Sequence, residues 1–296
     1  MIQDIAPHRF DNQYHPRMPR LDDMVLLYRK NRIYMQEDGK YPTVKELAEE
    51  DRMQLQYLFQ MDHVAYFTLL KEPRYLPAGY AFLVTRHLRG LHNNHIAFAG
   101  ISGYQLWSWY QSRMFCGSCG RSMQHDEKER MMRCTHCGNV EYPKICPAVI
   151  VGVIKGDSII LTRYAGRSYT KDALIAGFCE IGETLEQTVR REVMEEVGLK
   201  VKNIQYYKSQ PWSFTDTLLM GFFCEVDGDD KIVLDENELS SARFVRREDI
   251  MEDEEQISLT GEMMQMFKHG SISIKNIENV CYNECNKKHE EEKECV

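Results

Sequence analysis

The sequence has neither a long apolar run nor a net positive charge. Apolar residues never continue for the roughly 20 positions that a membrane-spanning helix needs. The first residues also lack the basic and then apolar layout of a secretion signal. Acidic residues (45) outnumber Lys and Arg (37) among 296 residues, for a net charge of −8. We therefore expect a cytoplasmic protein with no membrane partner, and one that does not bind nucleic acid tightly and indiscriminately.

Cysteine is plentiful, with ten residues, yet a chain without a secretion signal has little use for disulfides. Cys116 and Cys119 form one Cys-x-x-Cys pair, and Cys134 and Cys137 form a second after fourteen intervening residues. Four thiolates in this pattern predict a closed, structural Zn²⁺ site. Two redox pairs or disulfides are the alternative. The glycines expected to permit the tight turns are Gly117, Gly120 and Gly138.

A short amphipathic helix is predicted after residue 184. Leu185, Val189, Val193 and Val197 recur every fourth residue and form the expected buried face. Thr184 and Gln187 are spaced as a capping box, and Gly198 supplies a C-terminal stop.

Four glutamates lie on or just before this helix: Glu183, Glu192, Glu195 and Glu196. Glu192 and Glu196 are one turn apart on this helix with Glu195 beside them, so the three can converge on one metal centre. Carboxylates gathered in this way repel one another unless cations lie between them, and oxygen ligands suit Mg²⁺ or Mn²⁺, which also take phosphate oxygens. A solvated acidic helix face is the alternative, but the glycines and Arg191 at fixed offsets favour the metal site.

These positions resemble the Nudix box, which runs Gly, five residues, Glu, seven residues, Arg-Glu-aliphatic-any-Glu-Glu-any-Gly-aliphatic. Its defined positions are met by Gly177, Glu183, Arg191, Glu192, Val193, Glu195, Glu196, Gly198 and Leu199. The resemblance implies hydrolysis of a nucleoside diphosphate linked to another moiety, with Glu183, Arg191, Glu192, Glu195 and Glu196 in the catalytic set.

The same resemblance implies further metal ligands and roles. The carbonyl of Ala176 and a distal carboxylate join Glu192, Glu195 and Glu196 around Mg²⁺ or Mn²⁺. We assign the distal carboxylate to Glu238, with Glu236 as a nearby competitor. Arg191 is expected to pair with Glu183 or a neighbour and so fix the loop, and Glu195 is our choice of general base.

A second array, Ser209 to Thr217, resembles that of the NAD(+) diphosphatase family, also called NADH pyrophosphatases. Ser213 and Thr215 replace two prolines of the family pattern, which predicts a less rigid loop, and Thr217 replaces a serine. Together with the cysteine pairs before the box, this resemblance implies hydrolysis of NAD(H) to AMP and NMN(H). That family also removes NAD caps from RNA in bacteria.

The resemblance also implies a set of substrate contacts. Aromatic members would stack on a nicotinamide or adenine ring, although core packing is an equal alternative for Trp212 and Phe214. Tyr142 resembles a residue that reaches into the partner subunit's pocket, which implies a homodimer with composite sites. The full set comprises Glu129, Tyr142, Phe178, Gln210, Pro211, Trp212, Ser213, Phe214, Thr215, Asp216, Thr217 and Thr260.

The predicted class is α+β, with an N-terminal α/β domain, a zinc ribbon and a C-terminal Nudix α/β/α sandwich with a mixed sheet. The domain ranges are 1–112, 113–143, 144–270 and a charged tail, 271–296. Scattered histidines in the first region show no ligand spacing. In the tail, loose thiols are expected rather than a metal site at Cys281, Cys285 and Cys295. The predicted strands are 24–28, 32–35, 148–154, 158–162, 220–226 and 242–245. One predicted helix ends at residue 109, and another spans 259–267.

Two other functions remain open from the sequence. One is a Nudix hydrolase of ADP-ribose or dinucleoside polyphosphates, against which the cysteine module and the Ser209–Thr217 array both argue. The other is a zinc-ribbon nucleic-acid-binding module with a vestigial hydrolase, which the acidic net charge and the intact box disfavour.

Overall fold

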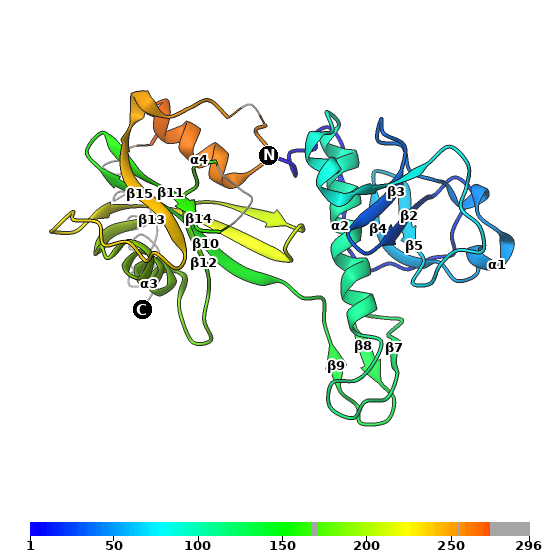
Figure 1. The fold of residues 1–296 in the computed structure, drawn as a ribbon. Helices are drawn as coiled ribbons and strands as arrows, with labels where there is room; N and C mark the ends of the chain where they lie inside the picture. The colour runs from blue at the N-terminus through cyan, green and yellow to red at the C-terminus, as the bar shows by residue number, and fades with distance from the viewer. Residues whose placement is uncertain (167–170, 254, 273–296) are drawn as a thin grey trace, which may run out of the picture. The chain divides into compact units, whose positions relative to one another are not determined.

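The computed structural model describes residues 1–166, 171–253 and 255–272 (Figure 1). Backbone contacts divide the chain into two compact units. The first unit comprises Met1–Ile145 together with Pro211–Thr217, and the second comprises Cys146–Gln210 and Leu218–Val296. The expected N-terminal domain and zinc ribbon therefore share one unit. Most of the expected tail, with Cys281, Cys285 and Cys295, lies outside the described residues.

A six-stranded sheet forms the centre of the first unit, in the order β1-β4-β5-β2-β3-β6. Neighbouring strands are antiparallel, except that β2 and β5 are parallel. The strands are β1 (Phe10–Asp11), β2 (Met24–Arg29), β3 (Arg32–Met35), β4 (Gln56–Met61), β5 (Val64–Thr68) and β6 (Ala81–Val84). The helical segments are η1 (Val44–Glu46), α1 (Glu49–Arg52), η2 (Thr85–Gly90) and α2 (Asn94–Ser112). The predicted strands 24–28 and 32–35 are confirmed and pair as a hairpin, with Lys30 in the left-handed region at its turn (φ 54°).

Helix α2 packs closely on this sheet through two glycines. A Cβ at Gly100 would overlap the Tyr41 hydroxyl, and one at Gly103 would overlap Leu26. The Tyr28 hydroxyl also donates a hydrogen bond to the Gly100 carbonyl at 2.7 Å. The predicted helix that ends near Trp109 is confirmed as α2, which spans Asn94–Ser112. Residues 85–90 form a 3₁₀ helix, and the extended backbone of Asn93 (φ −96°, ψ 91°) begins a separate α-helix.

Asp23 ties the segment before β2 to the sheet. Its side chain is nearly buried and accepts two 2.7 Å hydrogen bonds from the Arg17 guanidinium. The backbone N–H groups of Arg20 and Ala65 donate to the same carboxylate. Burial raises the pKa of Asp23, but these hydrogen bonds outweigh that effect and hold the pKa below its ordinary value of 3.8.

The second unit is built on six strands in the order β13-β14-β10-β11-β15, with β12 also paired to β10. The strands are β10 (Cys146–Lys155), β11 (Ser158–Tyr164), β12 (Ile175–Phe178), β13 (Val201–Trp212), β14 (Thr217–Val226) and β15 (Leu239–Arg246). Its helical segments are α3 (Leu185–Val197), η3 (Arg247–Asp249) and α4 (Leu259–Lys268). The expected closing helix, 259–267, is thus confirmed.

The two long helices of this unit cover opposite faces of its sheet (Figure 1). Val149, Val151 and Val153 of β10 alternate along the strand and share one buried cluster with the valines of α3. On the other face, Gly221 of β14 leaves room for Met263 of α4, whose sulfur a Cβ would approach within 2.7 Å. The predicted sandwich of helix, sheet and helix is confirmed.

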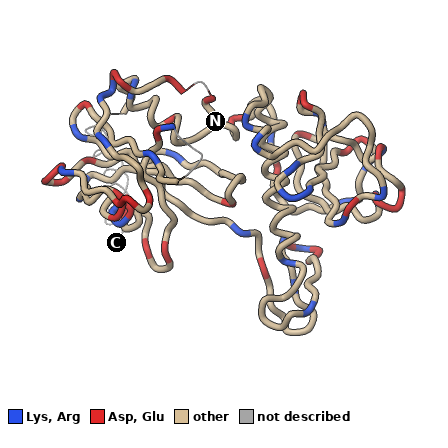
Figure 2. The backbone as a smooth tube through the Cα atoms, viewed as in Figure 1, with Lys and Arg blue, Asp and Glu red and all other residues tan. Residues whose placement is uncertain are grey.

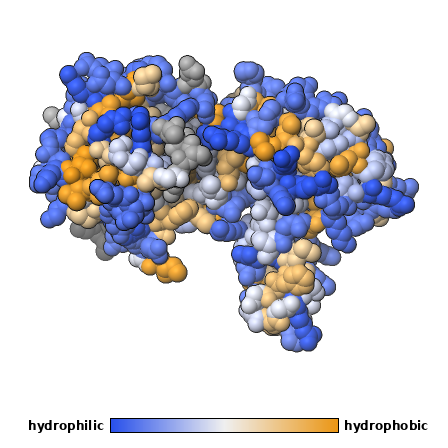
Figure 3. All heavy atoms as spheres, in the orientation of Figure 1, coloured by the Kyte–Doolittle hydropathy of each residue, from blue (hydrophilic) through white to orange (hydrophobic). Residues whose placement is uncertain are grey.

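The visible surface is mostly hydrophilic (Figure 3). Within the described part of the chain, no helix combines the length and apolar character needed to cross a bilayer.

Candidate active site

Helix α3 forms for the reasons that the sequence indicates. Thr184 and Gln187 complete a capping box, since the Thr184 hydroxyl accepts from the Gln187 N–H and the Gln187 side chain accepts from the Thr184 N–H. Gly198 ends the helix with a left-handed φ of 70°. Val189, Val193 and Val197 are wholly buried. Positions occupied by acidic residues cluster along α3 (Figure 2).

The box glutamates occupy different environments. Glu196 is 2% exposed and Glu192 is 7% exposed, whereas the side chain of Glu195 is 57% exposed. Gly177 of β12 lies directly against the Glu192 carboxyl group, which any Cβ at this position would overlap. The glycine that begins the box is therefore required for space, so that strand β12 can approach the carboxylate.

Arg191 lies at the centre of a network that joins the box loop to the helix. Its Nε and Nη2 donate to Glu183 at 2.7 and 2.9 Å, and its Nη1 donates to Glu192 at 2.7 Å and to Glu195 at 2.9 Å. Nη2 also donates to the Phe178 carbonyl at 2.9 Å. The predicted pairing of Arg191 with Glu183 is confirmed.

The same network holds the pKa of Glu183 far below its ordinary value. The Arg191 guanidinium, helped by the Thr188 hydroxyl and the Glu180 N–H, lowers its pKa to about 2. Glu183 consequently stays ionised and keeps hold of Arg191 at any ordinary pH.

The carboxylates around Glu192 suit a hard cation. The pKa of Glu192 is raised, mainly by burial. Arg191 opposes this shift, whereas the nearby charges of Glu195 and Glu238 add to it. Backbone N–H groups of Val233 and Asp235 bond to the Val197 and Glu196 carbonyls, and so dock the segment that carries Glu238 beside α3. The charge of Glu238, and not that of Glu236, acts on Glu192, which favours Glu238 as the distal carboxylate. Oxygen donors from Glu192, Glu195, Glu196, Glu238 and the Ala176 backbone fit Mg²⁺ or Mn²⁺ that retains waters.

The glutamates are more dispersed than the cysteines. Among the described residues, only the four cysteines form a set of three or more metal-binding side chains with ligand atoms within 4.8 Å of one another. Arg191 lies between Glu192 and Glu195 and already neutralises part of their charge. Metal ions at these carboxylates are therefore expected to be held partly through water.

The zinc ribbon is a three-stranded antiparallel sheet in the order β7-β8-β9, formed by β7 (Met123–His125), β8 (Met132–Cys134) and β9 (Val140–Glu141). Its two cysteine turns repeat the same hydrogen bond, from the Gly120 N–H to the Cys116 carbonyl and from the Gly138 N–H to the Cys134 carbonyl. Both glycines have a left-handed φ, of 72° and 76°. Gly117 is not in the left-handed region, so its turn does not depend on glycine.

The thiols of the ribbon fit a tetrahedral zinc ion. The sulfur atoms of Cys116 and Cys137 lie 3.6 Å apart, and those of Cys119 and Cys134 lie 3.5 Å apart. A tetrahedron with Zn–S bonds of about 2.3 Å has edges of about 3.8 Å. The N–H of Cys119, then that of Ser118, points at Cys116 and lowers its pKa to about 6, which favours the thiolate that binds metal.

Two predicted substrate contacts of the ribbon meet each other. The Tyr142 hydroxyl donates to the Glu129 carboxylate at 2.9 Å, although the two residues are thirteen positions apart in the sequence. Glu129 raises the pKa of Tyr142, so the phenol remains protonated. Tyr142 is 56% exposed, which leaves its ring accessible.

The Ser209–Thr217 array is not a single loop. Residues Ser209 to Trp212 continue β13, and Thr217 begins β14. The turn contains Asp216 at φ 57°. The rings of Trp212 and Phe214 lie 4.9 Å apart between centroids at 47°. The hydroxyls of Thr215 and Thr217 lie 2.7 Å apart.

Gln210 has a structural position rather than the open one expected of a substrate contact. It is fully buried, its Nε2 donates to the Ile257 carbonyl at 2.9 Å, and its Oε1 accepts from the Leu259 N–H at 2.7 Å. It thereby satisfies an N–H at the first turn of α4, which Ser258 also caps. We therefore remove Gln210 from the expected substrate set.

The remaining predicted contacts are more accessible. Phe178 is 56% exposed at the end of β12, and Thr260 is half-buried in the first turn of α4. Pro211 and Thr215 are exposed, whereas Ser213 and Thr217 are buried. Sequence reasoning missed Arg89 and Lys144, which contact Trp212 and Asp216. No local pattern connects residues so far apart in the chain.

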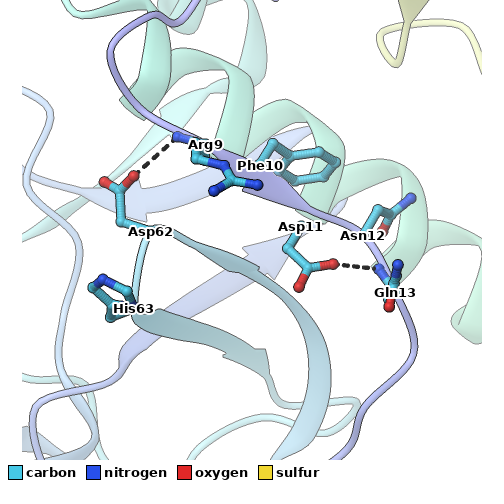
Figure 4. Close-up of a pocket in the computed structure, with 7 residues that line it drawn as sticks. All are labelled: Arg9, Phe10, Asp11, Asn12, Gln13, Asp62 and His63. Atoms are coloured by element: carbon cyan, nitrogen blue, oxygen red, sulfur yellow. Dashed lines mark hydrogen bonds between the residues drawn. The ribbon is translucent and has the colours of Figure 1, made fainter.

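An open hollow of about 710 Å³ on the first unit is a poorer candidate (Figure 4). Asp62 there already binds His8 and the Arg9 N–H, and Asp11 accepts from the Gln13 N–H. It contains none of the predicted catalytic or metal-binding residues. Its lining is Arg9, Phe10, Asp11, Asn12, Gln13, Asp62 and His63.

Comparisons with known proteins agree with this geometry. The model of the NUDIX domain matches residues 144–266, and that of the NADH pyrophosphatase zinc ribbon domain matches residues 113–142. The chain is 45% identical to the NAD-capped RNA hydrolase NudC of Salmonella typhi and to that of Escherichia coli K12, each over 148 residues. These matches cover 50% of this chain and 57% of each relative, so the chain spans little more than half the length of these relatives.

A NUDIX hydrolase of known structure from Nitrosomonas europaea aligns with 53% of this chain and 93% of its own, at 21% identity and a TM-score of 0.45. The assignment of the two domains rests on the matches to the family models. The chain contains an NADH pyrophosphatase zinc ribbon domain at residues 113–142, followed directly by a NUDIX domain at residues 144–266.

Proposed function

We propose that the protein is an NAD(+) diphosphatase, which hydrolyses the pyrophosphate of NAD(H) to AMP and NMN(H) with Mg²⁺ or Mn²⁺. The observation that carries the proposal is the Arg191 network, which fixes Glu183 and the buried Glu192 against Gly177. The adjoining zinc ribbon and the 45% identity to NAD-capped RNA hydrolases support the choice of substrate.

In the reaction, a water oxygen bonds to one phosphorus, the bridging P–O bond breaks, and one nucleotide leaves with the bridging oxygen. Divalent ions, when bound, neutralise the phosphate charge and acidify the water. Glu192 and Glu196 are held by burial on one face of α3 and supply ligand oxygens. Glu195 is exposed and takes the proton of the attacking water as general base.

Aromatic side chains are proposed to bind the nicotinamide and adenine rings of the substrate. Phe178 presents its ring beside the catalytic helix, and its carbonyl is fixed by Arg191. Trp212 and Phe214 form a second aromatic pair, and the Tyr142–Glu129 pair offers a phenol and a carboxylate for polar contacts. Pro211, Ser213, Thr215, Asp216, Thr217 and Thr260 complete the proposed contacts.

An RNA that carries a 5′-NAD cap presents the same pyrophosphate and is a larger substrate of the same class. The relatives at 45% identity bear the name of that activity. ADP-ribose or a dinucleoside polyphosphate remains the alternative substrate for a NUDIX domain. A zinc-ribbon nucleic-acid-binding module is the alternative outside catalysis, and the net charge of −8 gives it little support.

We further propose that the protein acts as a cytoplasmic homodimer. The exposed Tyr142 supports this proposal because, by resemblance, a tyrosine at this position completes the partner's site.

Purified protein incubated with NADH and Mg²⁺ or Mn²⁺ tests the proposal, with the products resolved by chromatography. AMP together with reduced mononucleotide is the expected result. If the protein hydrolyses ADP-ribose but not NADH, the assignment moves to the alternative hydrolase. Retention of RNA without hydrolysis of any nucleotide would favour the binding module. An NAD-capped transcript in the same assay measures the preference between free and capped substrate.

A further inference from the structure

The segment Pro211–Thr217 belongs to the same compact unit as residues 1–145. It includes Trp212 and Phe214, the aromatic pair proposed to bind a ring of the substrate. The segment has no proline after Pro211, so its backbone gains no stiffness there from fixed φ angles. The Thr215 N–H donates to the Trp212 carbonyl at 3.2 Å within the turn, and side-chain contacts within the first unit add to this hydrogen bond.

Arg89 makes one of these contacts. Its guanidinium carbon lies over the Trp212 ring, 5.5 Å from the centroid, within the roughly 6 Å range of a cation–π interaction. Arg89 is half-buried and follows Leu88, which is 1% exposed and anchors the 3₁₀ helix η2. Phe214 is tilted against the same ring, so the indole contacts both a cation and a second aromatic side chain.

Lys144 supplies a second contact at the other end of the turn. Its Nζ lies 3.6 Å from Asp216 Oδ2, and Asp216 has the left-handed backbone on which the turn depends. The Lys144 carbonyl accepts a hydrogen bond from Gln105 of α2 at 3.1 Å. The turn is therefore held at Trp212 by η2 and at Asp216 by the segment beside α2.

We propose that Arg89 is a positioning residue that fixes the Trp212 indole for stacking on a ring of the dinucleotide, with the Lys144–Asp216 pair holding the same turn. This inference rests on the proposed function. A planar side chain that is already fixed loses less conformational freedom when a ligand stacks on it. The planar guanidinium suits this task better than an ammonium group because it can lie parallel to the ring. The role of the first unit thus includes substrate affinity.

The kinetic test compares Arg89→Ala with Arg86→Ala, a matched control in the same 3₁₀ helix whose side chain is exposed. Loss of an interaction of this type should raise KM for NADH about two- to fivefold. We expect kcat to stay within about twofold, because Arg89 does not act on the reacting atoms. Equal KM values for the Arg89→Ala and Arg86→Ala variants would overturn the proposal.

A double-mutant cycle tests whether Arg89 acts through Trp212. In a Trp212→Leu background, Arg89→Ala should change KM by less than about 1.5-fold, because the ring that it positions is gone. Additive effects of the two substitutions would mean that Arg89 acts by another route and would reject the positioning role.

Fluorine NMR supplies a readout that does not depend on activity. The chain has three tryptophans, so protein labelled with 5-fluorotryptophan gives three signals, and Trp212→Leu identifies one of them. Arg89→Ala should shift and broaden the Trp212 signal, while Arg86→Ala leaves it in place. A Trp212 signal that Arg89→Ala leaves unchanged would contradict the inference, even if the protein hydrolyses NADH. An inactive wild-type protein with a sensitive Trp212 signal would instead sink the proposed function.

Discussion

Adjacent residues of α3 have very different surroundings. Glu195 is largely exposed and binds Arg191, whereas Glu196 is 2% exposed. This difference suits a division of labour in which Glu196 holds a cation and Glu195 exchanges a proton with water. The separation follows from helix geometry, because a step of one residue rotates a side chain by about 100°.

Replacing Glu196 with Gln tests this assignment. The substitution preserves the shape of a buried side chain but removes a ligand charge, and we expect a rate loss of about 10²- to 10³-fold, as for other charge-stabilising groups. Turnover of NADH is measured, with circular dichroism to confirm the fold. Glu186→Gln, at an exposed position of the same helix, is the control and should retain activity. Near-normal turnover by Glu196→Gln would place the metal site elsewhere.

Asp23 allows a prediction about stability and pH. Its folded-state pKa is below 3.8, so its stabilising effect is present above the unfolded pKa and is lost as pH falls through the lower folded value. Asp23→Asn should reduce the free energy of unfolding by about 3 kcal/mol at pH 7, because it strips Arg17 of its partner. Denaturant melts should show this difference shrinking below pH 3.8. A difference that stays constant to pH 2 would contradict the linkage.

The secondary-structure elements differ in how well local sequence predicts them. Helix α3 was predictable because Thr184, Gln187 and Gly198 act within one turn of its ends. The hairpin around Lys30 was predictable for a similar reason. The use of Gln210 at the start of α4 was not, because its partners Ile257 and Leu259 lie almost fifty residues away. Contacts at that separation depend on the packing of whole elements.

The site shows the same division. The Nudix box residues were identified by resemblance to the family pattern, and the two cysteine pairs by their spacing, because one tight turn brings each pair together. The hydrogen bond between Tyr142 and Glu129 required the ribbon to fold, and the contact of Arg89 with Trp212 joins residues more than a hundred positions apart. Neither leaves a periodic signal in the sequence.

At the scale of an element, we predict that the zinc ribbon depends on its metal for stability. Cys119→Ser removes one of four ligands, so zinc content should fall well below about one ion per chain and the melting temperature should drop. Metal is quantified by mass spectrometry and melting by calorimetry. Cys146→Ser, at a half-buried thiol outside the ribbon, controls for loss of a cysteine. Unchanged zinc stoichiometry in Cys119→Ser would reject the ribbon site.

At the scale of the whole molecule, the proposed homodimer predicts a mass in solution of about twice the 34.8 kDa of one chain. Sedimentation equilibrium measures that mass. If Tyr142 serves the partner's site, Tyr142→Ala and Glu196→Gln chains are each impaired but complement each other when mixed. If the two variants pair at random, half of the dimers contain one chain of each kind, and each of these has one intact site out of two. About a quarter of wild-type activity should then return. A monomer, or a mixture without recovery, would disprove the composite site.

The close approach of Gly177 to Glu192 has an evolutionary consequence. A library randomised at position 177 should return glycine alone under selection for turnover, because a single methyl group would push the carboxylate out of place. Acceptance of alanine should require a second change that withdraws the acid, such as Glu192→Asp, with its oxygen atoms one methylene further back. The two positions are therefore expected to vary together or not at all.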